Sequence, residues 1–116
     1  CNRTIKSEEI NLLPIPQVAL RLENGSTAIL MWNVPPNSKV TDINSFEVFA
    51  LMVTPDEQGK SLARWVKVGQ LKAIKLPMAC RIRRLLGKKT SLHHFIVRAI
   101  GNDGQTGPYS LPAAAS

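Results

Sequence analysis

The stretch QVALRLENGSTAILMWNV, residues 17–34, has the pattern of a β-hairpin. Apolar and polar side chains alternate over residues 17–23, as in a strand with one buried face. Residues 24–26 form a turn sequence that contains Asn-Gly, and residues 27–34 are a second, more apolar strand. Two consecutive prolines then end the pattern, because proline cannot donate a backbone hydrogen bond to a sheet.

Five more strand-like segments follow this hairpin. They are residues 43–53, 63–71, 78–85, 92–100 and a last strand that starts near Thr106 and carries Tyr109. Loops rich in glycine and proline separate them, and no segment has a convincing helical period. Seven short strands at this spacing predict an all-β sandwich. We expect an N-terminal tail over 1–14, one domain over 15–112, and a second tail over 113–116 that resembles a cloning remnant.

Length and composition indicate a single globular domain, with 116 residues and 44% hydrophobic residues. No apolar run approaches the ~20 residues that a membrane-spanning helix needs, and no signal-peptide pattern follows Cys1. Two cysteines are too few for a disulfide framework and mildly favour a reducing compartment. Asn2 and Asn24 match the glycosylation acceptor pattern, which is a weak signal on its own.

The net charge of +7 is unevenly distributed, because residues 58–102 contain no acidic residue. Such a window favours an acidic protein, a nucleic acid or an anionic surface as partner. A solvated basic face that keeps the domain soluble is the alternative. The predicted basic surface consists of Arg81, Arg83, Arg84, Lys88 and Lys89.

The sequence does not predict an enzyme. Most acidic residues lie in the tail or in loops, and no two of them suggest an acid–base pair. His93 and His94 are adjacent on a strand, so they point to opposite faces and cannot easily bind one metal ion. Cys80 fits a small buried apolar residue. We therefore expect no catalytic, cofactor-binding or metal site.

Several positions resemble the fibronectin type III domain, a seven-stranded immunoglobulin-like β-sandwich. Trp32 and Phe46 occupy the aromatic core positions of the second and third strands. Residues 93–99, HHFIVRA, match the aromatic-x-x-x-Val-x-Ala pattern of the sixth strand except at His93, where the family usually has tyrosine. Because that tyrosine pins the corner before the sixth strand, we expect an altered corner. Residues 107–112, GPYSLP, match the usual start of the last strand.

The stretch KAIKLPMAC, residues 72–80, is more specific. It resembles the C-terminal fibronectin domain of the activating transcription factor 7-interacting protein family, also called MCAF or Windei. Members are nuclear cofactors of a histone H3 lysine methyltransferase that act in heterochromatin formation and gene silencing. Their C-terminal domain binds chromatin repressors, including a methyl-CpG-binding protein. The resemblance implies a non-catalytic docking role in the nucleus. We expect the ligand to be a short apolar and acidic segment of a repressor, and both strand addition to a sheet edge and insertion into a groove stay open.

In this fold the third and sixth strands pair, so their outward side chains share one face. A solvated face normally carries polar residues, yet Phe49, Leu51 and Ile96 are bulky and apolar. Such a patch indicates that something covers it. The predicted partner-binding residues are Phe49, Leu51, Lys67, His94, Ile96 and Arg98. The alternative is that residues 12–13 or 71–76 of the same chain cover the patch.

Two other functions stay open from the sequence. An extracellular adhesion or receptor module is the commonest use of this fold, but the chain has no Arg-Gly-Asp motif. A nucleic-acid-binding surface would use the basic residues, but charge alone is weak support. Single-strand binding also needs exposed aromatic residues for base stacking, and only six aromatic residues are present.

Overall fold

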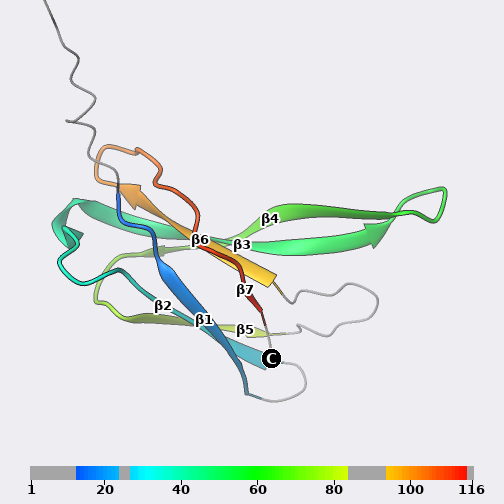
Figure 1. Cartoon of the computed structure of the whole chain (residues 1–116), viewed down its shortest axis with the longest axis horizontal. Coiled ribbons are helices and arrows are strands. Elements are labelled where there is room, and N and C mark those ends of the chain that lie inside the picture. The colour runs from blue at the N-terminus through cyan, green and yellow to red at the C-terminus, as the bar shows by residue number, and fades with distance from the viewer. Residues whose placement is uncertain (1–12, 24–26, 84–93, 115–116) are drawn as a thin grey trace, which may run out of the picture.

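The computed structural model describes residues 13–23, 27–83 and 94–114, which form a sandwich of two antiparallel sheets (Figure 1). The three-stranded sheet has the order β1-β2-β5, and the four-stranded sheet has the order β4-β3-β6-β7. The elements are β1 (Gln17–Leu22), β2 (Thr27–Asn33), the 3-10 helix η2 (Val40–Asp42), β3 (Ile43–Pro55), β4 (Ser61–Lys72), β5 (Met78–Arg83), β6 (His94–Gly101) and β7 (Ala113–Ala114). The predicted all-β sandwich is confirmed.

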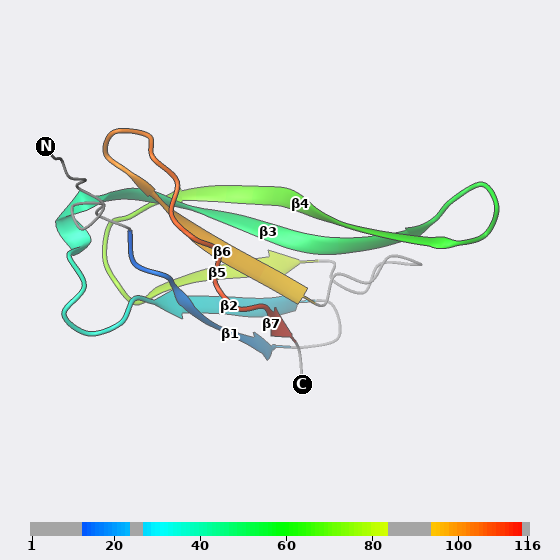
Figure 2. The same ribbon diagram turned by 45° about the horizontal axis from the view of Figure 1, so that its top comes forward.

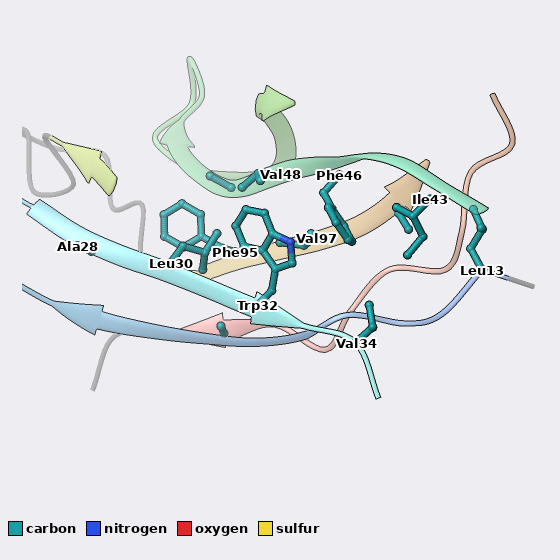
Figure 3. Close-up of a cluster of buried hydrophobic side chains, with 13 residues drawn as sticks. Leu13, Ala28, Leu30, Trp32, Val34, Ile43, Phe46, Val48, Phe95 and Val97 are labelled. Carbon is teal, nitrogen blue, oxygen red and sulfur yellow. The ribbon is translucent and has the colours of Figure 1, made fainter. Parts of the chain in front are cut away.

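The core lies between the two sheets and is built from every second residue of β2, β3 and β6 (Figure 3). Trp32 of β2 and Phe46 of β3 meet there edge to face, with ring centroids 5.7 Å apart and planes at 61°. Such a pair adds about 0.5–1.5 kcal/mol to the effect of burial alone. The aromatic core positions that the sequence predicts are thus the contact between the sheets.

β3 and β4 are longer than predicted and extend past the rest of the sandwich (Figure 2). They pair as far as Pro55 and Ser61, whereas the described part of β6, which starts at His94, accompanies β3 as far as Ala50. Residues 51–65 therefore form a two-stranded projection, which we call the β3–β4 arm. The Asp56 side chain closes its turn by accepting hydrogen bonds from the backbone N–H groups of residues 58 and 60, at 2.9 and 2.7 Å.

The last strand differs most from its prediction. Thr106 makes only an isolated bridge with Ile100, and the regular strand β7 comes seven residues later, at Ala113–Ala114. The intervening Pro108 and Pro112 have no N–H group, so a continuous ladder cannot run through them. Ala113, which we assigned to the second tail, is buried and pairs with Phe95.

Smaller differences concern the ends of other elements. The short 3-10 helix η2 was not predicted. Residues 84–85 and 92–93, which we assigned to the fifth and sixth strands, lie outside the described residues, as does the turn at 24–26. The altered corner expected at His93 lies there too. The limits of the domain and of its two tails stay predictions.

We expect the Leu30→Ala substitution to lower the free energy of unfolding by about 2–5 kcal/mol. Leu30 is fully buried in the core, so its removal leaves a cavity. Leu111→Ala makes the same chemical change at a side chain that is 84% exposed, and its effect should stay within about 0.5 kcal/mol. Urea unfolding of both variants measures the difference. Equal effects would contradict the described core.

Candidate partner-binding face

The outward side chains of β3 lie between those of β4 and β6 on one face of the four-stranded sheet. Phe49 lies opposite Lys67 on β4 and opposite Ile96 on β6. Glu47, two residues earlier, lies opposite Arg98. The third and sixth strands pair as predicted, and this pairing places four of the six predicted partner-binding residues together.

Glu47 joins these strands through two ion pairs. Its carboxylate accepts hydrogen bonds from Arg98 Nε at 2.7 Å and Lys67 Nζ at 2.9 Å. Lys67 Nζ also donates to Gln70 Oε1 at 2.8 Å, and Gln70 Nε2 donates to Ser45 Oγ at 3.1 Å. The Lys67 hydrogen bond, aided by Arg98, holds the pKa of Glu47 below its usual range, while burial acts in the opposite direction. The network fixes both cations at the centre of the face.

Arg98 covers two aromatic rings. Its guanidinium carbon lies 5.3 Å from the centroid of Phe49 and 4.8 Å from that of Tyr109. The two rings meet edge to face at 5.4 Å. Distances within about 6 Å allow a cation–π attraction. Ile96, which we expected to be exposed, lies on the same face but is only 6% exposed.

Tyr109 is the main residue that the sequence analysis missed around Glu47, Phe49 and Arg98. It lies on a segment that follows β6 back along its outer edge. Gly107 N–H donates to Ala99 O at 2.8 Å, and Ser110 N–H donates to Val97 O at 2.9 Å. The buried Ser110 hydroxyl also accepts from Val97 N–H at 2.9 Å. These bonds hold the ring of Tyr109 against the sheet.

The segments that we offered as alternative covers lie elsewhere. Leu13 is buried in the core cluster, and Leu71 and Leu76 pack against that cluster. Residue 12 lies outside the described residues. The chain thus covers part of the predicted patch, but with Tyr109 and Arg98.

The other half of the face continues onto the β3–β4 arm. Leu51 lies opposite Trp65, whose side chain is 40% exposed. Trp65 alternates with Lys67 along β4, so the strand pattern alone could have placed it on this face. His94 is exposed at the start of β6 and pairs with Ala114. The largest exposed apolar side chain near the predicted face is therefore that of Trp65.

The predicted basic surface belongs to the other sheet. Arg81 and Arg83 are exposed on β5, and the guanidinium of Arg81 makes two hydrogen bonds to the carboxylate of Glu23, at 3.0 and 3.1 Å. Arg84, Lys88 and Lys89 lie outside the described residues. One of the two described cations of this surface is thus already paired with an acid.

The described residues offer little of the chemistry of a metal or nucleophilic site. Over 13–23, 27–83 and 94–114, no three His, Cys, Asp or Glu side chains are grouped so that they could hold a metal ion. Cys80 is half-buried, and burial raises the pKa of its thiol, which disfavours the reactive thiolate. No helix in these ranges is long and apolar enough to cross a membrane.

A model of the fibronectin-III type domain matches residues 12–114 of this chain. The chain belongs to the fibronectin type III family. Two solved structures share the fold of this fibronectin type III domain. A chain of titin kinase and its flanking domains has a TM-score of 0.59 at 21% identity, over 90% of this chain and 17% of that one. The third fibronectin III domain of the human KIAA0343 protein has a TM-score of 0.57 at 14% identity, over 96% and 86%.

Its curated relatives are named activating transcription factor 7-interacting proteins. Protein 1 of Gallus gallus is 30% identical over 99 residues, which are 84% of this chain and 9% of the relative. Protein 1 of Homo sapiens is 29% identical over 93 residues, which are 79% of this chain and 7% of the relative. Protein 2 of Homo sapiens is 30% identical over 81 residues, which are 69% of this chain and 11% of the relative. The resemblance to this family is confirmed, and the chain spans about a tenth of the relatives' length.

The family domain and the named relatives together indicate a non-catalytic interaction module of a transcription-related protein.

We expect Glu47→Gln to lower the free energy of unfolding by about 1–3 kcal/mol at neutral pH, since two charge-assisted hydrogen bonds are weakened. The lowered pKa sets the pH dependence. The Glu47 carboxylate stabilises the folded state above the unfolded-chain pKa of about 4.3, and this contribution is lost as pH falls through the folded-state pKa. The difference between native and variant domains should therefore be constant above about pH 5.5 and shrink towards pH 3.

Urea unfolding over this pH range measures that difference. Glu57→Gln is the matched control, because Glu57 is exposed in the turn of the arm and its replacement should change stability little. A Glu47→Gln effect that is the same at pH 3 and pH 7 would show that the ion pairs do not stabilise the folded state.

Proposed function

We propose that this fibronectin type III domain is a protein-docking module of a nuclear transcriptional cofactor. In this proposal the parent protein works with a histone H3 lysine methyltransferase in heterochromatin formation and gene silencing. The domain binds a chromatin repressor, either a methyl-CpG-binding protein or a subunit of a silencing complex. The ligand is a short segment of that repressor with apolar and acidic residues.

The similarity to activating transcription factor 7-interacting proteins carries this proposal. It extends over 69–84% of the chain. The relatives are named for an interaction with a transcription factor, which supports a protein partner and a nuclear location.

The outer face of the four-stranded sheet has the composition of a docking surface. Arginine and aromatic residues are enriched among the residues that contribute most to binding, typically inside a rim that excludes water. Here Phe49, Tyr109 and Arg98 are already held in place by their mutual contacts and by Glu47. Binding to such a rigid cluster loses little side-chain entropy. Leu51 extends the apolar surface towards the arm.

The charge of the face supports an acidic ligand. Glu47 pairs with two cations, so the cluster with Lys67 and Arg98 keeps a net positive charge. Nucleic acid is a weaker candidate, because the described part of the predicted basic surface includes the Arg81–Glu23 ion pair on the other sheet. Extracellular adhesion is a third candidate function, and the capture experiment below distinguishes it from repressor docking.

We expect Leu51→Glu to reduce the capture of chromatin repressors from nuclear extract by about tenfold or more, because it places an acid in the apolar part of the face. Leu62→Glu is the matched control. It makes the same change on the same arm, but Leu62 lies opposite Thr54 and so projects from the other face. A substitution of Ile96 would test stability instead of binding, because Ile96 is buried.

The measurement is capture by the immobilised domain at moderate and high salt, with quantification of a methyl-CpG-binding protein and of nucleic acid. Repressor capture that resists salt and is lost only with Leu51→Glu supports the docking role on this face. Capture of nucleic acid alone, or capture that salt abolishes for every variant, would refute it. Capture of extracellular-matrix proteins but no repressor would favour adhesion.

A further inference from the structure

β4 lies at the edge of the four-stranded sheet, and no described strand pairs with its outer side. Among the described strands it has one neighbour, β3. Within the described residues, β3 also has no second neighbour in the arm after Ala50 (Figure 2). An isolated two-stranded ribbon is marginally stable, and a third strand adds both hydrogen bonds and apolar contacts. The described part of the chain thus supplies no third strand to the arm.

The hydrogen-bond alternation of an antiparallel pair shows which backbone groups of β4 point to this edge. Asp56 N–H donates to Lys60 O at 2.6 Å, so residues 56 and 60 are bonded to each other. Alternate residue pairs then bond in the same way, 54 with 62, 52 with 64 and 50 with 66. The intervening residues 61, 63, 65 and 67 direct their N–H and C=O groups away from β3.

The other side of β3 gives the same alternation independently. Val97 donates its N–H to the Ser110 hydroxyl and accepts from Ser110 N–H at its carbonyl, on the side of β6 that faces away from β3. Ile96 must then bond to Phe49 across the β3–β6 ladder, so the backbone groups of Phe49 do not face β4. The backbone N–H and C=O groups of Lys67, which lies opposite Phe49, therefore point to the outer edge. We call residues 61–67 the open edge of β4.

The open edge ends at a β-bulge. Val48 pairs with Gly69 and Phe49 pairs with Lys67, so Val68 is an extra residue in β4. A bulge twists an edge strand and interrupts regular pairing beyond it. An added strand therefore has about seven residues of β4 to pair with.

The charge of the open edge selects its partner. It carries Arg64 and Lys67 and no acidic residue. Within the described residues Arg64 has no salt-bridge partner, whereas Lys67 is paired with Glu47 of β3 and its side chain is 44% exposed. A second copy of this chain would bring the same positive charges. An added strand with acidic residues opposite Arg64 and Lys67 gains attraction, because directly opposite charges stabilise a pair of strands.

We infer that the open edge of β4 binds an extended acidic segment of another protein as an additional strand. The segment has acidic residues three positions apart with two apolar residues between them, because Trp65 and Val66 separate the two cations. This acid-apolar-apolar-acid pattern holds for either strand direction. The inference rests on the proposed docking function and specifies a ligand chemistry and a binding mode for the arm side of that face.

The test uses two end-capped synthetic peptides, Thr-Glu-Val-Ile-Glu-Thr-Val and its charge-reversed form Thr-Lys-Val-Ile-Lys-Thr-Val. The domain should bind the acidic peptide and show slower amide exchange at Ala63, Trp65 and Lys67, as followed by NMR. The acidic peptide should bind at least about tenfold more tightly than the basic one. Unchanged exchange at those three amides, or equal affinity for both peptides, would overturn the inference.

Three variants separate backbone pairing from charge. Ala63→Pro removes one N–H group that points to the open edge and that is not bonded to β3. The affinity for the acidic peptide should fall at least about fivefold, since one hydrogen bond and the fit of the added strand are lost. Arg64→Glu should weaken the acidic peptide and strengthen a form with lysine at the matching position. Lys72→Glu, past the bulge, makes a similar charge change and should have little effect.

The variants also distinguish this inference from the proposed function. If Ala63→Pro stays folded, captures repressors normally and binds the acidic peptide as well as the native domain does, the edge-pairing mode is wrong and the docking role stands. If the native domain binds the peptide but no repressor from nuclear extract, the open edge is real and the proposed chromatin partner is wrong. Loss of the fold in Ala63→Pro leaves the exchange and charge-swap results to decide.

Discussion

The alternation of side chains along β3 is the constraint on which the rest of the domain depends. Its inward residues, Phe46 and Val48, meet Trp32 of the opposite sheet and form the core. Its outward residues, Glu47 and Phe49, form the centre of the candidate face. A shift of one residue would exchange the two sets, burying a carboxylate between the sheets and exposing the core aromatic. The hydrophobic pattern that folds the protein therefore also fixes where a partner can bind.

The Glu47 ion pairs matter more for orientation than for net stability. Removing charges from water has a cost that offsets much of the attraction between them, so partly buried ion pairs are weak evidence for a stable fold. Their geometric effect is larger here. Arg98 and Lys67 come from strands on either side of β3, and one carboxylate holds both. Because Arg98 then lies over Phe49 and Tyr109, the same ion pair sets the shape of an aromatic surface.

The sequence predicts what depends on local alternation and fails where distant segments meet. It placed Phe49, Ile96 and Arg98 on one face, because strand parity and one pairing rule suffice for that. It could not reveal that Tyr109 packs against Phe49, because a proline-containing segment reaches β6 through irregular hydrogen bonds. Charges were predicted as one basic surface, yet Arg81 pairs with Glu23, 58 residues away in the chain.

Edge strands need protection against pairing with the wrong strand, and β4 carries two of the usual devices, positive charge and a bulge. Neither device removes the backbone groups that point outward before the bulge; the bulge limits how long an added strand can be. The positive charges disfavour a second copy of the chain and favour an acidic strand, so protection and recognition come from the same side chains. Specificity of this kind rests on repulsion of competitors as much as on attraction of the ligand. Because no described strand pairs with the outer side of β4, a strand that meets the charge requirement can reach this edge without displacing any described strand (Figure 1).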